Sequence, residues 1–291
     1  MSLVASVVAG VLAFQAAGSQ PPAQDATRID DIVVNARRDA DQIRSFLDDI
    51  SLPERSLNTA RFFEKVCVGV VNLRPDAAQL IADRVSLIAE EIGLQAGEPG
   101  CTPNILVIAA NDGAGLARGL VQRSRRAFDP GGSGMVRNRS ALQAFQSGDA
   151  AIRWWHVAVP VDAHTGNLAV RLPGEDAPVV TGSNSRLRSE LRHDIARVIV
   201  IVDISKLDGL HFGQVADYVS MVSLSQVDAG GNFEGYDSIL SLLADNPQVQ
   251  SLTEWDEAYL KALYSAELNQ VSKSHQRGEI ARLMEAARSE D

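Results

Sequence analysis

The apolar run from Ala196 to Ile204 (ARVIVIVDI) is the sequence feature that most constrains the fold. Its Val and Ile residues follow one another instead of alternating with polar residues, which is typical of a strand buried on both faces. Val66 to Val71 (VCVGVV) and Ile105 to Ala110 (ILVIAA) have the same character, and a helical pattern lies between them. Buried strands that alternate with helices predict an α/β fold with a mixed sheet.

A further strand is expected at Trp154 to Val161 (WWHVAVPV). The segment Leu168 to Leu172 follows it after a turn at His164 to Asn167, so the two segments are predicted to pair as a hairpin.

The C-terminal third is predicted to be helical. Phe212, Val215, Ala216, Val219 and Val222 form one apolar stripe, and Ile280 to Ala287 carries another at the same spacing. Between them, Thr253 to Asp256 resembles a capping arrangement that opens a further helix. The predicted class is therefore α/β, or α+β if the helices are segregated from the strands, with a mixed sheet and a helical C-terminal third.

No repeat or linker divides residues 58–291, so we expect one domain over this range. Residues 19–57 are expected to be a mobile N-terminal segment that contains one short amphipathic helix. The helix is predicted because Ile43, Phe46, Leu47 and Ile50 recur at helical spacing.

The apolar run Ser2 to Phe14 has the length of a signal-peptide core, and small residues precede a possible cut after Gly18. Residues 1–18 are therefore interpreted as a signal peptide, with a short buried apolar helix as the alternative. No later stretch approaches 18 apolar residues, so the mature chain is expected to lack a transmembrane segment. The predicted location is periplasmic or secreted.

The chain contains two cysteines, Cys67 and Cys101. In an exported protein, a single pair of this kind predicts one disulfide. If the chain is not exported, two reduced thiols are the alternative. Neither residue belongs to a CxxC motif, so a redox centre or a Cys-rich zinc site is not expected.

The segment Asp31 to Ala36 (DIVVNA) resembles the TonB box of TonB-dependent outer-membrane receptors, an extended segment that adds a strand to its partner's sheet. The alternative, which we favour, is an edge strand of the protein's own sheet. Both interpretations expect an extended conformation here.

Charge and residue spacing exclude several function classes. The net charge of −10 provides no cationic field for a phosphate backbone, so nucleic acid is not an expected partner. No two of the five histidines are three to five residues apart, so a two-His helical zinc site is not expected. Each histidine is expected at the surface or at a strand end. The glycines from Gly113 to Gly119 lie between a predicted strand and a predicted helix, as in a dinucleotide-binding loop. The second strand ending in Asp or Glu that should follow about 20 residues later is missing, so no cofactor is predicted.

The order of elements after Ala196 resembles the C-terminal part of zincin metallopeptidases, in particular of their matrixin-like members. In those enzymes a last strand leads into the H-E-x-x-H helix, followed by an S-I-M-type turn and a helix ending in L-x-x-L-Y. Gly213 to Leu224, Asp237 to Leu240 and Thr253 to Tyr264 match these parts. The chain as a whole resembles an uncharacterised family of exported alphaproteobacterial proteins. The resemblance to zincins implies that the elements after Ala196 have a zincin-like layout.

The metal motif of the resemblance is missing. Gln214 and Tyr218 stand at its two His positions and Val215 at its Glu position, so neither zinc ligands nor a general base are supplied. The resemblance therefore implies a pseudoenzyme with a binding or structural role, whose partner is an unidentified protein or small ligand. Catalytic activity is not favoured.

Two other functions remain open. The first is a hydrolase with an atypical carboxylate site formed by Asp217, with Gln214 and Tyr218 as further candidates. Asp217 lies one position off the apolar stripe of its helix, so it is either half-buried or, as we favour, a solvated surface carboxylate. The second is a TonB-linked accessory factor, which depends on Asp31 to Ala36 alone.

Overall fold

The computed structural model describes residues 29–52, 58–132, 135, 137–172, 174, 176–182, 188–245 and 247–289. The chain divides into two compact units, Met1–Arg37 and Arg38–Asp291. The second unit contains the sheet and its helices and is described below.

A mixed sheet with strand order β1-β7-β5-β3 forms the centre of this unit, and β6 pairs with the other side of β7. Strands β3 (Val68–Val71), β5 (Ile105–Ala110) and β7 (Leu191–Asp203) are parallel, whereas β6 (Ile152–Asp162) is antiparallel to β7. The short strand β1 (Ala60–Arg61) continues the ladder beside the first half of β7. A separate two-stranded sheet joins β2 (Lys65–Val66) to β4 (Gln95–Ala96).

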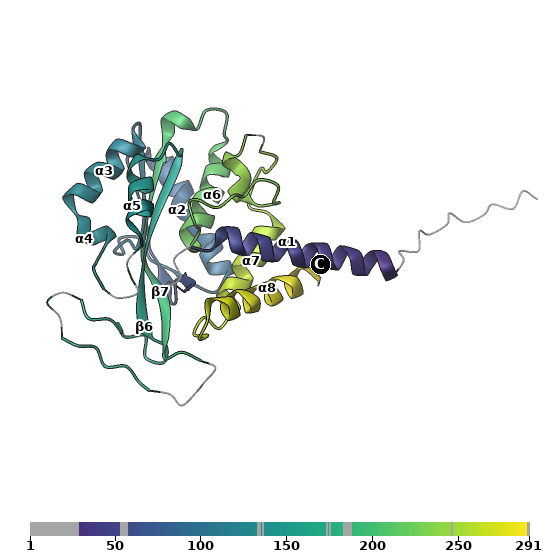
Figure 1. Ribbon diagram of the computed structural model, residues 1–291. Helices are drawn as coiled ribbons and strands as arrows, with labels where there is room; N and C mark the ends of the chain where they lie inside the picture. Colours follow the sequence, from purple (N-terminus) through teal and green to yellow (C-terminus); the bar gives the residue numbers. More distant parts are fainter. Residues whose placement is uncertain are drawn as a thin grey trace, which may run out of the picture. The chain divides into compact units, whose positions relative to one another are not determined.

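Helices cover both faces of the sheet, as Figure 1 shows on either side of β6 and β7. One face carries α3 (Gly113–Arg123), α4 (Arg125–Phe128) and α5 (Arg139–Ser147). The other face is covered by α2, the second half of α1, and the C-terminal helices. Their bounds are α1 Ile29–Ile50, α2 Pro75–Glu91, α6 Phe212–Leu224, α7 Glu254–Ser265 and α8 Lys273–Ser289, with 3-10 turns η1 Ile204–Lys206 and η2 Ile239–Leu243.

Alternate side chains of β7 pack into two hydrophobic clusters, one on each face of the sheet. Val198, Val200 and Val202 belong to the larger cluster with α2, α6, α7 and α8, whereas Ile199 and Ile201 belong to the cluster with α3, α4 and α5. Successive side chains of a strand point to opposite faces, so a continuous apolar run fits a strand that is covered on both sides. The predicted α/β class and the helical C-terminal third are confirmed.

The core extends further toward the N-terminus than expected. Ile43, Phe46, Leu47 and Ile50 of α1 are buried in the larger cluster, where the Phe46 ring contacts four other aromatic rings. The compact unit therefore reaches back to Arg38, ahead of the boundary expected at residue 58, and residues 38–50 are packed and not a mobile segment.

The extended conformation expected for Asp31–Ala36 is wrong, because these residues lie within helix α1. The apolar positions 29, 32, 33 and 36 have the same helical spacing as the stripe that continues to Ile43 and Leu47. The helical spacing of apolar residues over this longer stretch is a stronger indication of local structure than a six-residue motif.

The predicted hairpin is also wrong in its second strand. Leu168 forms a single bridge with Val161, and the turn is closed by the Asp162 N–H donating to the Asn167 carbonyl at 2.8 Å. The partner of β6 along its whole length is β7. Because β6 is buried on both faces, it needs a partner of matching length and apolarity, and β7 provides one.

Cys67 and Cys101 form the predicted disulfide, with Cα atoms 6.1 Å apart. The bridge joins the residue between β2 and β3 to the loop after β4. A Cβ atom at Gly97 would lie 2.6 Å from the Cys101 sulfur, so this position requires glycine for the close approach.

The predicted signal peptide, residues 1–18, lies outside the described residues. Within the part of the chain that the structure describes, no helix combines the length and the apolar character needed to span a bilayer.

Candidate groove along the edge of strand β6

A groove of about 980 Å³ lies beside strand β6. Every residue from Gly148 to Trp155 lines it, which means that the groove follows the backbone at the start of the strand. Helix α5 forms one wall through Ser140, Ala141 and Ala144. The segment from Asp228 to Asp245 contributes the opposite wall, and Tyr218 of α6 reaches the groove between them.

The outer edge of β6 is free where it borders this groove. The Asp203 N–H donates to the Ala151 carbonyl, so residues 151, 153 and 155 bond to β7 and the backbone groups of Ile152 and Trp154 point the other way. No hydrogen bond joins those outward groups to any described residue. This short stretch of backbone is therefore unpaired. Ile152 is 0% and Trp154 5% exposed, so a guest strand reaches it only when the groups that cover it move aside.

Further along β6 the outward groups are already used. The Pro160 carbonyl accepts from the Ala169 N–H at 2.9 Å, and Asp162 bonds to Asn167. Pro160 itself has no N–H, and its nitrogen faces outward, where a strand can dispense with the bond. The outward groups at this far end of β6 are thus paired, whereas those of Ile152 and Trp154, beside the groove, are not.

Both tryptophans at this end of β6 are fixed by hydrogen bonds. The Trp154 indole N–H donates to the Val227 carbonyl at 2.9 Å, and the Trp155 indole donates to the Phe128 carbonyl at 2.8 Å. The Arg137 guanidinium lies 4.9 Å from the Trp155 ring centre. These contacts hold the strand rigidly between the two helical layers.

Tyr218, one of the three sequence candidates, is 4% exposed, and its ring packs edge-on against Trp154 with centroids 6.0 Å apart. Burial raises the pKa of its hydroxyl, so the side chain stays neutral. The hydroxyl has no hydrogen-bond partner among the described residues. It is therefore a neutral polar group at the groove with spare bonding capacity.

Gln214, the second candidate, serves the start of α6. Its side-chain oxygen accepts from the His211 N–H at 2.9 Å and completes a capping box, while its amide donates to the Val249 carbonyl at 2.9 Å. Both ends of the amide are thus engaged in holding the helix and the segment before α7.

Asp217, the third candidate, is 5% exposed, so the solvated position favoured from the sequence is wrong. One carboxylate oxygen pairs with the Arg84 guanidinium of α2, and the other accepts from the Leu252 N–H at 2.9 Å. Asp217 and Gln214 therefore share the face of α6 toward residues 249–252, whereas Tyr218 faces the groove. The structure does not bring the three candidates together around one cavity.

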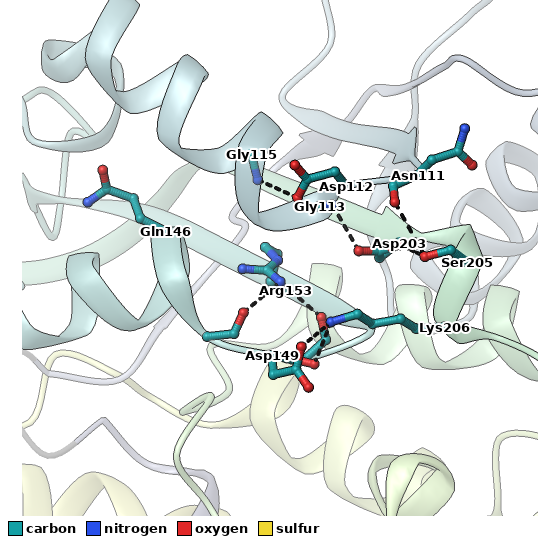
Figure 2. A network of polar contacts seen from close by, with 12 residues as sticks. Asn111, Asp112, Gly113, Gly115, Gln146, Asp149, Arg153, Asp203, Ser205 and Lys206 are labelled. Atoms are coloured by element: carbon teal, nitrogen blue, oxygen red, sulfur yellow. Dashed lines mark hydrogen bonds and ion pairs between the residues drawn. The ribbon is translucent and has the colours of Figure 1, made fainter.

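A polar network around Arg153 joins the start of β6 to the end of β7 and the start of α3 (Figure 2). The Arg153 guanidinium is buried and donates to the carbonyls of Phe145, Gly148 and Ala150 at 2.9 to 3.1 Å. Burial lowers its pKa, and the nearby carboxylate of Asp203 opposes that shift. Arg153 thereby ties the end of α5 to the start of β6.

The same network orders the start of α3. Asp203 accepts from the Gly113 N–H at 2.9 Å and from the Ser205 hydroxyl at 2.6 Å, while Asp112 caps the helix by accepting from Gly115. A Cβ atom at Gly113 would lie 3.3 Å from the Arg153 Nε atom, so glycine allows the close packing. The acidic cap occupies the helix N-terminus at which a phosphate would bind.

The prediction that each histidine lies at the surface or at a strand end is wrong for His156, which is buried in the middle of β6. His193 is also buried, but it lies near the start of β7. The His156 Nε2 atom lies 2.8 Å from the Val222 carbonyl, and burial together with the charge of Arg137 lowers its pKa to about 3. His156 is therefore a neutral core residue that joins β6 to the end of α6.

Sequence reasoning missed the groove itself. Its position depends on which strand pairs with β6, which the sequence pattern does not specify. Two local signals were present: Pro160 inside a strand indicates an edge, and Arg153 interrupts an otherwise apolar run.

Among the described residues, no group of three His, Cys, Asp or Glu side chains is arranged to hold a metal ion. Searches of family models, curated proteins and solved structures found no match to this chain.

Proposed function

We propose that this protein is an exported, zincin-like pseudoenzyme that binds an extended peptide along the free edge of β6. The observation that carries the proposal is the unpaired backbone of Ile152 and Trp154 beside a groove of about 980 Å³. An extended peptide that adds to a sheet edge gains main-chain hydrogen bonds, and the flanking walls select its side chains.

The zincin-like part of the proposal is supported by the order and placement of the elements after β7. Helix α6 follows β7, and a turn at Ser238 and Ile239 lies between α6 and α7. The buried carboxylate of Asp256 accepts hydrogen bonds from the Ser238 hydroxyl, the Ile239 N–H and the Thr253 N–H. These bonds fix the turn to the start of α7. The turn belongs to the segment from Asp228 to Asp245 that forms one wall of the groove, so the bonds also hold that wall in place.

The side chains at the positions of the zinc motif do not fit a zinc ion. Val215 has no donor atom, and the Gln214 amide already bonds at both ends. Tyr218 is neutral, since burial raises its pKa, and the thiolate, imidazole or carboxylate groups that zinc prefers are absent from these three positions. No catalytic step through a metal is derived for this chain.

Both carboxylate oxygens of Asp217 are engaged by Arg84 and Leu252, so the alternative hydrolase with Asp217 at its centre gains no support from the geometry. The disulfide between Cys67 and Cys101 supports the exported part of the proposal, because such bonds persist in oxidising compartments.

The proposal is tested by selecting binders from a library of random eight-residue peptides on the full chain and measuring affinity by fluorescence polarisation. The selected peptide is then N-methylated at one residue at a time. We expect methylation to weaken binding at alternate positions, because only every second N–H of a strand faces β6. Equal sensitivity at all positions, or no retained peptide, would overturn the proposal.

A matched pair of variants locates the site. Ala144→Trp places a bulky side chain on the exposed, groove-lining face of α5 and is expected to abolish binding. Gln143→Trp lies next to it on the same helix, is also exposed and does not line the groove. Binding that survives Ala144→Trp would place the peptide elsewhere.

A further inference from the structure

We infer that the groove selects basic peptides, with Lys or Arg at alternate positions of the bound strand. The inference rests on the proposed function and specifies its ligand. It is carried by the charges on the two walls and by the unpartnered hydroxyl of Tyr218.

The positive charges that line the groove already have partners. Arg137 pairs with Asp228 at 3.5 Å and lies over the Trp155 ring, and Lys206 pairs with Asp149. Arg153 is buried and bonded to three carbonyls. These three cations are therefore not available to recognise an acidic ligand.

Two negative charges on the 228–245 wall have no such compensation. Glu234 and Asp245 line the groove, are exposed, and form no ion pair with any described residue. An uncompensated pair of carboxylates beside a strand edge favours a cationic guest and disfavours an anionic one.

Tyr218 is a second, independent observation that points to a ligand. Its side chain is more than nine-tenths buried and lines the groove, and its hydroxyl has no partner among the described residues. A neutral phenol accepts a hydrogen bond from an ammonium or guanidinium group, and its ring attracts a cation.

The geometry of a β-strand determines which side chains of a bound peptide face these charges. Ile152 and Trp154 direct their side chains into the core cluster that also contains Phe233 and Leu240 of the 228–245 wall. Every second side chain of a guest strand points to the same side of the sheet, toward Glu234, Asp245 and Tyr218. The intervening side chains face α5, whose groove-lining residues Ser140, Ala141, Ala144 and Phe145 are uncharged.

Three peptides of equal length test the inference on the full chain: acetyl-(Thr-Lys)4-amide, acetyl-(Thr-Gln)4-amide and acetyl-(Thr-Glu)4-amide. We expect the lysine peptide to bind about tenfold more tightly than the glutamine peptide, and the glutamate peptide to bind more weakly than both. The preference is expected to shrink as salt is raised.

The double variant Glu234→Gln/Asp245→Asn is expected to bring the affinity for the lysine peptide down to that for the glutamine peptide. Its matched control, Glu90→Gln/Glu91→Gln, removes the same charge from α2, outside the groove, and should leave the preference unchanged. An equal loss in both double variants would mean nonspecific attraction to an acidic protein and would overturn the inference.

The outcomes separate the two proposals. If all three peptides bind equally and Ala144→Trp abolishes their binding, the charge preference is wrong and the peptide groove stands. If neither these peptides nor the random library bind, both proposals fail.

Discussion

The two sides of helix α6 differ in how their polar groups are used. On the side toward residues 249–252, Gln214 and Asp217 form hydrogen bonds with backbone groups and with Arg84. On the side toward the groove, the Tyr218 hydroxyl has no partner among the described residues. The comparison teaches that burial of a polar side chain does not by itself indicate a site: the closed side stabilises the fold, and the open side is where a ligand can bind.

The largest expected effect concerns the closed side. Asp217→Ala leaves the Arg84 guanidinium and the Leu252 N–H without their acceptor, so we expect the free energy of unfolding to fall by about 3 kcal/mol. Urea denaturation measures the loss. Asp217→Asn keeps one oxygen for Leu252 and should lose less. A loss below about 1 kcal/mol in Asp217→Ala would show that the pair does not hold the fold.

The second prediction concerns His156, at the far end of α6. Its pKa of about 3 in the folded state lies below the usual 6.5, so the unfolded chain binds more protons between these values. Stability contributed by the neutral ring is therefore lost as pH falls, by about 2.5 kcal/mol from pH 6 to pH 4.

His156→Gln retains a donor for the Val222 carbonyl and does not titrate, so its unfolding free energy should depend less on pH over this range. The exposed His275→Gln variant is the control and should follow the natural chain. Parallel pH curves for all three proteins would contradict the assignment of His156 as the acid-sensitive group.

A smaller effect is expected at Gln214. Gln214→Ala removes the bonds to the His211 N–H and the Val249 carbonyl, which should cost about 1 to 2 kcal/mol in thermal or urea unfolding. Gln250→Ala removes only the long contact at 3.4 Å between the two side chains and should be nearly neutral. Similar losses in the two variants would mean that the cap does not stabilise α6.

The smallest effect on stability is expected on the open side. Tyr218→Phe deletes a hydroxyl without a protein partner, so the unfolding free energy should change by less than about 0.5 kcal/mol, while affinity for the lysine peptide falls. A stability loss above about 1 kcal/mol would show that the hydroxyl serves the fold, and the contrast between the two sides of α6 would disappear.

Elements with long apolar patterns were predictable from the sequence. The residues of β5, β7, α6 and α7 show periods that match their burial on one or both faces. The disulfide followed from a single pair of cysteines. The helices and strands depend on the local spacing of apolar residues, and the disulfide depends on the number of cysteines. Both can be read directly from the sequence.

Features that depend on pairing across the chain were not predictable in the same way. Asp217 is buried because Arg84, 133 residues away, provides its counter-charge. The hairpin prediction assigned β6 to its nearest neighbour, whereas β7 offers the longer apolar partner. The groove follows from that pairing, because the strand on the other side of β6 is missing. Single-sequence patterns indicate which segments are strands but leave their order in the sheet open.

The position of β7 has a consequence for the order in which the molecule assembles. It is the last strand along the chain, yet it contacts β1, β5 and β6, which precede it. Until residue 203 is available, those earlier strands lack the partner that joins them, so we expect folding to be slow, dominated by distant contacts, and dependent on protection of the unpaired strands while the chain is incomplete.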